Sequence, residues 1–455
     1  MSSSTRRMRP SAMSARSSKR RRRRTLPATA GAAAAVDAEP DASPWASLHE
    51  DLVGLIGWRV LAGDLLDYVR FRAACTNWRS STACPRGRGV VDPRFHPRRW
   101  MMLPEGHGLY PGHGKLRGYV RFFNLSTGAF VRVRLPLFRN HCALNSTDGI
   151  MLLQRDHDTA VRLLNPFTGD ITELPRLDTL GSPVPLEQRQ LETLRAVVAA
   201  AISVSADETV RVTMSMHLSQ GFIFATSRDQ IWRMSSFGLS LFYTPLPFQG
   251  KIYVVDDSQC SDGFEVLQIG PPQQDEMDPD FLYLPPPEFV AKCPVKPSNV
   301  RICVIYFLAE CNSEILLITM HVLDHDHQFS VYRLADLIME RIVPVTDLGS
   351  NSIFLGPFSS RMLSVSAKAF PTITADSIVF LDNYKHYLAQ YQLSTRTLSP
   401  TSDGHVLGII ALPSPRSIFY YIFTCCFREK WNKGHLMFEA STQRWRVKGK
   451  WRSGA

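Results

Sequence analysis

Residues 106–115 have the composition of a phosphate-binding loop but not its spacing. The stretch Gly-His-Gly-Leu-Tyr-Pro-Gly-His-Gly-Lys is rich in glycine and ends in lysine. A Walker loop would require glycine at position 109 and serine or threonine at position 116, and leucine occupies both. We therefore assign no nucleotide site to it.

The second candidate for chemistry is a ligand-rich cluster, which comprises His321, Asp324, His325, Asp326 and His327. Alternate residues of a strand share a face, so His325 and His327 could meet a metal ion. A polar turn between two apolar strands explains the cluster equally well, because metal sites usually draw a further strong ligand from a second segment. No metal and no cofactor are assigned.

No other segment supplies catalytic machinery. The chain has no HExxH, GxSxG or EF-hand pattern. Cys425 and Cys426 lie in the apolar run "SIFYYIFTCCF", which we expect to form a buried strand. A nucleophile, a base and an orienting third group are not found together. The sequence therefore predicts a protein that is not an enzyme.

The positive charge of the chain is concentrated at its start. The net charge of +11 includes ten basic residues within positions 1–24, so that 42 basic and 41 acidic residues are left for the body. Residues 1–44 contain little that could be buried, and we predict that they form a disordered tail. The run Lys19, Arg20, Arg21, Arg22, Arg23 and Arg24 is a nuclear-import candidate. A solvated basic tail with weak contacts to RNA or acidic lipid is the alternative.

Cysteine usage and hydropathy bear on the compartment. The nine cysteines are odd in number and form no CxxC pair, which fits a reducing compartment better than a disulfide framework or a zinc site. No signal-peptide core opens the sequence, and no apolar run reaches the roughly 20 residues of a membrane span. We expect a location in the nucleus, the cytoplasm or both, with no membrane partner.

A short helical motif is predicted for residues 45–82. Ser47 and Glu50 have the spacing of a capping box, and Leu48, Leu52, Leu55 and Ile56 follow at helical spacing. Gly63 interrupts the pattern, and Asp64 can cap a second helix. So small a unit cannot bury a good core alone, so we expect it to pack on a partner or on the following domain.

A repeated β unit follows, within residues 100–450. The segments 119–136 and 159–175 share two alternating strands around an Asn-x-x-Thr-Gly turn, and weaker copies lie at 387–400 and 435–449. Hairpins recurring every 40–50 residues predict the blades of a β-propeller, roughly seven in number. The segment 185–201 has a helical pattern. Alternation alone is also compatible with a pair of β-sandwiches.

The helical motif resembles an F-box. "LHEDLVGLI", then "DLLDYVRFRAACTNWRS", carries the leucines and the closing Cys-x-x-Trp-Arg of that family, although His49 stands where proline is usual and three residues are inserted between Leu66 and Phe71. The resemblance implies docking on a Skp-type adaptor and, through it, on a cullin. The residues expected to pack the motif and contact the adaptor are Leu48, Leu52, Ile56, Leu65, Leu66, Cys75 and Trp78.

The remainder resembles the KIB-type β-propeller domain that plants place behind an F-box. "LLNPFTGDITELP", "DLGSNSIFLG", "SVSAKAFPTITADSIVFLDN" and "LAQYQLSTRTLSP" carry the likeness. The fold class implied is mainly β, with a small N-terminal helical motif. The function implied is the substrate-recognition subunit of a Skp-cullin ubiquitin ligase, whose propeller selects an unknown protein target for ubiquitination.

Two alternatives stay open at this point. The helical motif could have lost its adaptor, and the protein could instead be a nuclear nucleic-acid-associated or scaffolding protein that uses its basic tail. The near-neutral body argues against nucleic-acid contacts beyond the tail. For target binding, the candidate rim loops are Gly106–Gly114, Pro271–Asp280 and His321–His327, since loops of propellers carry recognition.

Overall fold

A computed structural model describes most of the chain. The described residues are 44–103, 119–155, 160–180, 197–216, 221–239, 245–258, 263–278, 281–294, 303–323, 326–356, 361–382, 387–405, 417–426, 435–439 and 444–448. The basic tail with its import candidate, and the loop 104–118, lie outside them. The chain divides into two units between Ser47 and Leu48.

Helices come first in the second unit. They are α1 (Glu50–Gly63), α2 (Leu65–Ala74), α3 (Thr76–Ser80) and the short η2 (Pro93–Phe95). The expected break at Gly63 is confirmed, and Asp64 caps α2 through hydrogen bonds that its Oδ1 accepts from the Leu66 and Asp67 amides. The prediction of a capping box formed by Ser47 and Glu50 was wrong. His49 is the N-cap of α1, whereas Ser47 ends a separate turn, η1 (Pro44–Ser47), and its hydroxyl donates to Pro44 O.

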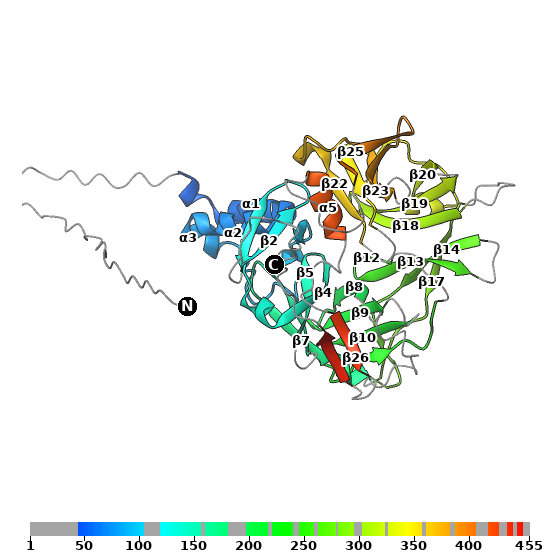
Figure 1. Cartoon of the computed structure of the whole chain (residues 1–455). Helices are drawn as coiled ribbons and strands as arrows, with labels where there is room; N and C mark the ends of the chain where they lie inside the picture. Colours follow the sequence, from blue (N-terminus) through cyan, green and yellow to red (C-terminus); the bar gives the residue numbers. More distant parts are fainter. Residues whose placement is uncertain are drawn as a thin grey trace, which may run out of the picture. The chain divides into compact units, whose positions relative to one another are not determined.

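Six sheets then follow in chain order as the blades of a propeller (Figure 1). Blade 1 consists of β1 (Trp100–Met102), β2 (Tyr119–Asn124) and β3 (Phe130–Arg134). Blade 2 consists of β4 (His141–Thr147), β5 (Ile150–Arg155), β6 (Ala160–Leu164) and β7 (Ile171–Arg176). Blade 3 consists of β8 (Val197–Val204), β9 (Val210–Met216), β10 (Phe222–Thr226) and β11 (Arg233–Met234).

The second half of the propeller is less regular. Blade 4 consists of β12 (Leu246–Phe248), β13 (Lys251–Ser258), β14 (Gly263–Ile269) and β17 (Glu288–Lys292), with the hairpin β15 (Gln273–Gln274) and β16 (Leu282–Tyr283) inserted. Blade 5 consists of β18 (Cys303–Cys311), β19 (Glu314–Leu323) and β20 (Asp326–Arg333). Blade 6 consists of β21 (Asn351–Phe354), β22 (Leu363–Ser366), β23 (Ser377–Asp382), β24 (Tyr387–Gln392) and β25 (Thr397–His405).

Short connecting elements complete the fold. They are η3 (Pro136–Arg139), η4 (Leu177–Leu180), α4 (Leu334–Ile338), η6 (Ala367–Ala369), α5 (Ile418–Cys426) and the hairpin β26 (His435–Glu439) with β27 (Arg444–Lys448). All four repeated units of the sequence are hairpins, as predicted. Six blades replace the expected seven, because insertions such as β15–β16 lengthen the true period beyond the hairpin spacing.

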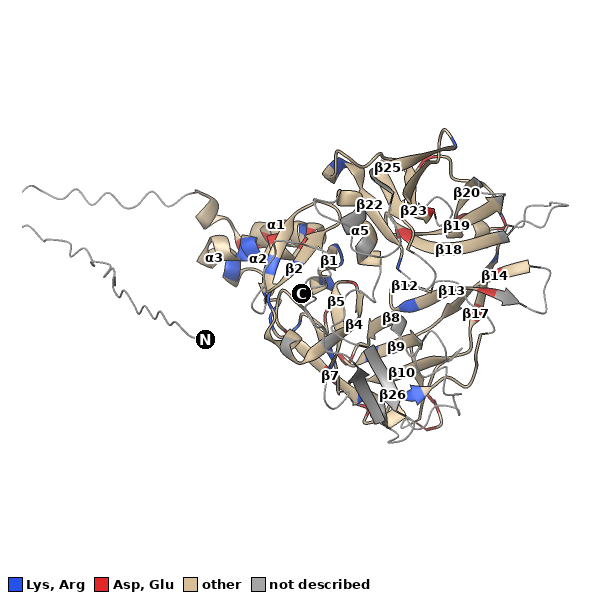
Figure 2. Cartoon of the chain, in the orientation of Figure 1, with Lys and Arg blue, Asp and Glu red and all other residues tan. Residues whose placement is uncertain are grey.

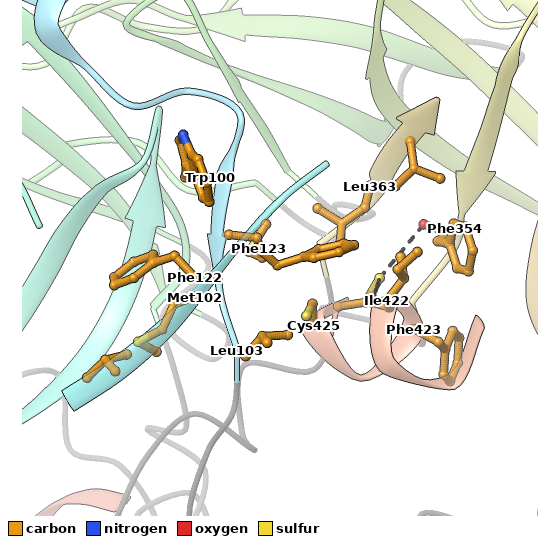
Figure 3. Packing of buried hydrophobic residues seen from close by; sticks show 14 of the residues in the cluster. Trp100, Met102, Leu103, Phe122, Phe123, Phe354, Leu363, Ile422, Phe423 and Cys425 are labelled. Atoms are coloured by element: carbon orange, nitrogen blue, oxygen red, sulfur yellow. Dashed lines mark hydrogen bonds between the residues drawn. The ribbon is translucent and has the colours of Figure 1, made fainter. Parts of the chain in front are cut away.

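The core is divided among the blade interfaces. Apolar clusters lie between blades 2 and 3, 3 and 4, 4 and 5, and 5 and 6. A fifth cluster joins blade 6 to blades 1 and 2 around helix α5 (Figure 3). This distribution is expected of a propeller, since each sheet can bury its faces only against its neighbours.

Two expectations about local structure were wrong. Residues 197–201 begin strand β8 rather than continue a helix, and residues 185–196 lie outside the described ranges. The run 417–427 contains helix α5 rather than a strand. Phe419, Ile422, Phe423 and Cys426 are buried at helical spacing, and a short apolar run cannot be assigned to helix or strand by hydrophobicity alone.

No helix in the described part of the chain combines the length and the hydropathy that a membrane crossing requires.

Candidate functional site

Helix α1 presents an apolar face to solvent. Leu52, Leu55, Ile56 and Trp58 are 50%, 64%, 39% and 41% exposed. Residues three and four apart lie on the same side of a helix, so Leu52, Leu55 and Ile56 share one side. Trp58 adjoins Leu55, and the exposed Arg59 lies on the same side. The opposite side of α1 is buried through Val53, Gly57 and Leu61. A monomer rarely leaves such a surface uncovered, which marks the α1 face as a candidate interaction site.

Helix α2 packs against the buried side of α1. Leu61, Leu65, Tyr68 and Phe95 form a small buried core. The Tyr68 hydroxyl donates to Ala83 O at 2.8 Å, which ties the helices to the chain that follows them. Gly57 lies at a close approach, because a Cβ there would lie 2.8 Å from Thr82 Cγ2 and would force a shift. The α1 face is therefore presented by a packed scaffold.

Helix α3 is stabilised by contacts at the break from α2. The Cys75 Sγ accepts a hydrogen bond from the Trp78 amide at 3.4 Å, which caps α3. The Phe71 and Trp78 rings stack with their centroids 4.5 Å apart. The Asn77 side chain donates to Leu48 O at 3.0 Å, so α3 also holds the residue that precedes α1.

The helices are joined to blade 1 through Asp64. Its Oδ2 accepts hydrogen bonds from Trp100 Nε1 at 2.6 Å and from Asn124 Nδ2 at 3.0 Å. Leu66 packs against the cluster that contains Trp100, Phe122 and Phe123. Polar and apolar contacts thus fix α2 on the first blade.

The repeated Asn-x-x-Thr-Gly turns of blades 1 and 2 hold the helices and the segment that follows them. In each turn the asparagine Oδ1 accepts hydrogen bonds from the backbone amides two and three residues further on, for Asn124 and again for Asn165. The side-chain nitrogen is then free to donate outward: Asn124 donates to Asp64, and Asn165 donates to Gly89 O and Phe95 O. Asp170 adds hydrogen bonds from the Gly87 and Gly89 amides.

Charged residues lie at the ends of helices α1, α2 and α3 (Figure 2). Glu50 and Asp51 lie in the first turn of α1, and Arg72 and Arg79 in the last turns of α2 and α3, where each sign suits the helix dipole. The Arg94 guanidinium lies 4.8 Å from the Trp58 ring centroid. Its hydrogen bonds to Asp92 hold the pKa of that carboxyl below its usual value.

The seven residues predicted for packing and adaptor contact separate into three groups. Leu52 and Ile56 lie on the exposed α1 face. Leu65 is 3% exposed and Leu66 packs toward the propeller, so both contribute to packing. Leu48, Cys75 and Trp78 are partly buried. Sequence reasoning did not include Leu55 and Trp58 in the predicted set, although Leu55 follows Leu52 by three positions.

The other sequence candidates are only partly described. Loop 106–114 lies outside the described residues, and 279–280 and 324–325 interrupt the other two loops. His321 and His327 are buried on opposite faces of blade 5, since Val322 and not His321 lies across from His327. Within the described ranges, no three His, Cys, Asp or Glu side chains are grouped as metal ligands. Cys425 is buried, and burial raises the pKa of its thiol to about 12.

Comparison with known families decides the identity of the propeller. The family model for the KIB1-4 beta-propeller matches residues 122–409. The chain belongs to the KIB1-4 beta-propeller family. The match begins in β2 and ends just after β25, so the six blades coincide with it apart from the first strand.

More distant likenesses add no detail to the KIB1-4 assignment. The propeller domain of Cps50 (Swd1) from Myceliophteria thermophila is 11% identical, with 63% of this chain and 78% of that chain covered and a TM-score of 0.26. The dihydro-heme d1 dehydrogenase NirN is 13% identical, with 71% and 67% covered and a TM-score of 0.25. No curated protein matches the sequence significantly. Helices α1–α3 lie outside the KIB1-4 match.

Proposed function

We propose that this KIB1-4 propeller protein is the substrate-recognition subunit of a Skp-cullin-type ubiquitin ligase. In this proposal helices α1–α3 act as an F-box that docks on a Skp-type adaptor, and the propeller holds a protein target. The observation that carries the proposal is the exposed apolar face of α1, formed by Leu52, Leu55, Ile56 and Trp58. A few side chains that become fully buried near the centre of an interface carry most of its binding energy, and tryptophan is enriched among them.

The junction at Asp64 supports such a role physically. A receptor works by holding its target at a fixed distance and direction from the ligase, which raises the effective concentration of target lysines. Hydrogen bonds from Trp100 and Asn124 to Asp64 and the packing of Leu66 fix the helices on the propeller that would hold the target. In the proposal the protein contributes position, and its partners contribute the chemistry.

The proposal is tested by binding of the full chain to a purified Skp-type adaptor. The double variant Leu52→Ala/Ile56→Ala should bind at least tenfold more weakly than the wild type, because it truncates two side chains at the centre of the face. Ile338→Ala/Ile342→Ala is the matched control, since these side chains, at the end of α4 and four residues beyond it, are 55% and 64% exposed. Unchanged adaptor binding by the first variant, with both variants folded, would contradict the proposal.

The basic tail supports a second function, in which the protein associates with nucleic acid. Ten basic residues within positions 1–24 could neutralise several phosphates, and affinity would then fall steeply with salt. Deletion of residues 1–24 separates the two functions. Adaptor binding should persist in the truncated chain, whereas retention on a single-stranded oligonucleotide column should be lost.

A further inference from the structure

Blades 1 and 2 contain the same hairpin with different charges. Asn124 and Asn165 occupy equivalent turns 41 positions apart, so each residue of β2 and β3 has a counterpart in β6 and β7. In blade 2, Arg162 lies directly across from Glu173 and forms an ion pair with it at 2.9 Å. In blade 1, the corresponding cross-strand pair is Arg121 and Arg132.

The like-charged pair is unusual for a sheet. Like charges directly opposite one another destabilise an antiparallel pair, whereas opposite charges stabilise it. Arg134 extends the same face, at the position where blade 2 has Pro175. Arg132 and Arg134 are both exposed. The edge strand of blade 1 therefore presents two exposed arginines, Arg132 and Arg134, where the edge strand of blade 2 has Glu173 and Pro175.

Aromatic side chains lie on the same face as these arginines. Phe130 is 55% exposed and Tyr119, across from Arg134, is 45% exposed. The counterparts in blade 2 are Ile171 and Ala160. The face of β3 thus reads Phe130, Arg132, Arg134 at two-residue spacing, with successive side chains about 6.5–7 Å apart along the strand.

Strand β3 is also an edge strand. Among the described residues it pairs only with β2. The equivalent edge in blade 2, β7, contains Pro175, which cannot donate a backbone hydrogen bond, and proline is a usual protection of sheet edges. Strand β3 has no proline, so its outer backbone groups are chemically able to pair with a further strand.

The surrounding sequence is strongly basic. Residues 86–147 contain eleven Lys or Arg, against the two acidic residues Asp92 and Glu105. Outside the tail the body has 42 basic and 41 acidic residues, so removing this segment leaves 31 basic and 39 acidic residues. The near-neutral body is therefore polarised, and the blade 1 region would attract an acidic partner.

We propose that strand β3 binds an extended acidic peptide by strand addition, with acidic side chains opposite Arg132 and Arg134 and an apolar side chain opposite Phe130. An antiparallel peptide would read acidic-x-acidic-x-apolar from its N-terminus, because its first acidic residue faces Arg134. That such a peptide belongs to a ubiquitination target rests on the proposed ligase function. Its binding is a property of the propeller and needs no adaptor.

The test uses the full chain without adaptor and a fluorescent peptide, Ser-Glu-Val-Glu-Val-Phe-Ser. We expect anisotropy to show saturable binding that weakens as salt is raised. Arg132→Glu should weaken binding at least tenfold. This variant restores the Arg–Glu pair of blade 2, so it should fold at least as well as the wild type.

Three controls make the result specific. Arg132→Glu/Arg134→Glu should bind the Lys-for-Glu version of the peptide better than the wild type does. The peptide amides form two alternating sets, and strand addition uses only one of them. N-methylation of the set that faces β3 should abolish binding, and N-methylation of the other set should not. Equal affinity for the Glu and Lys peptides, insensitivity to Arg132→Glu, or tighter binding of an oligouridine than of the peptide would each overturn the proposal. None of these outcomes depends on whether α1 binds a Skp-type adaptor.

Discussion

The Asp64 carboxylate accepts a hydrogen bond from Trp100 Nε1 at 2.6 Å, which joins the cap of helix α2 to the first strand of the propeller. One oxygen caps the helix and the other is shared by Trp100 and Asn124. A single side chain therefore serves both local structure and packing between elements. Its removal should loosen the helices while the blades stay folded.

Asp64→Ala should destabilise the helical segment by about 2–4 kcal/mol, from the lost cap and the two donors left without this acceptor. Hydrogen exchange of amides in residues 50–80 would measure the change. Asp67→Ala is the control. Its carboxylate is exposed and, within the described residues, pairs with the exposed Arg70, so the effect should stay below about 0.5 kcal/mol. Equal exchange in the two variants would show that Asp64 does not hold the junction.

Substitution by alanine should destabilise the N-terminal helices strongly at one leucine and only slightly at another. Leu65 is 3% exposed and Leu52 is 50% exposed. Leu65→Ala should lower the free energy of unfolding of the helices by about 2–4 kcal/mol, whereas Leu52→Ala should change it by less than about 0.5 kcal/mol. Hydrogen exchange of the helix amides measures the stability change in each variant. A strongly destabilised Leu52→Ala would mean that the α1 face is part of a core.

Much of this arrangement could be predicted from the sequence, and the reasons differ between elements. The cap at Asp64 and the Asn-x-x-Thr-Gly hairpins were predicted because their hydrogen bonds join neighbours in the chain. The capping box failed because His49, rather than Ser47, caps α1. The outward bond from Asn124 to Asp64 spans 60 positions and has no local signal.

The helix that closes the propeller, α5, could not be predicted either, because the residues it packs against are distant in the sequence. Helix α5 comes after the last blade and fills the space between blades 6 and 1 (Figure 3). A continuous apolar run fits either a helix or a strand when both of its sides are buried, so only the neighbouring blades decide its form. The KIB-type likeness predicted the propeller as a class, but the number of blades depended on the lengths of the insertions.

Substitution within α5 should open the ring at this closure. Ile422 is fully buried in the cluster that contains Leu103, Phe354 and Leu363. Ile422→Ala should destabilise the propeller by about 2–4 kcal/mol through lost contacts and a residual cavity. Ile338→Ala, at a side chain 55% exposed, should change stability by less than about 0.5 kcal/mol. Denaturant unfolding with equal effects in both variants would exclude α5 as the closure.

Two turn glycines should differ in their tolerance of alanine. Gly149 and Gly169 both have φ of 79°, which is unfavourable for alanine by about 1–2 kcal/mol. A Cβ at Gly149 would lie 2.1 Å from Pro97 O, whereas one at Gly169 would meet no atom within 4 Å. Gly149→Ala should therefore cost at least about 2 kcal/mol more than Gly169→Ala. Denaturant midpoints of the two variants, compared at equal slope, measure this difference, and similar midpoints would contradict it.

The buried His96 should make the protein sensitive to mild acid. Burial lowers the pKa of His96 and outweighs the hydrogen bond of its Nε2 to Val90 O at 2.9 Å. Below about pH 6.5 the histidine of an unfolded chain binds a proton that the folded protein resists, so stability is lost as pH falls from there through the folded-state pKa. His96→Gln removes this titration. Thermal midpoints between pH 7.5 and 5.5 should fall more steeply for the wild type than for this variant, and parallel curves would show that His96 does not determine the acid response.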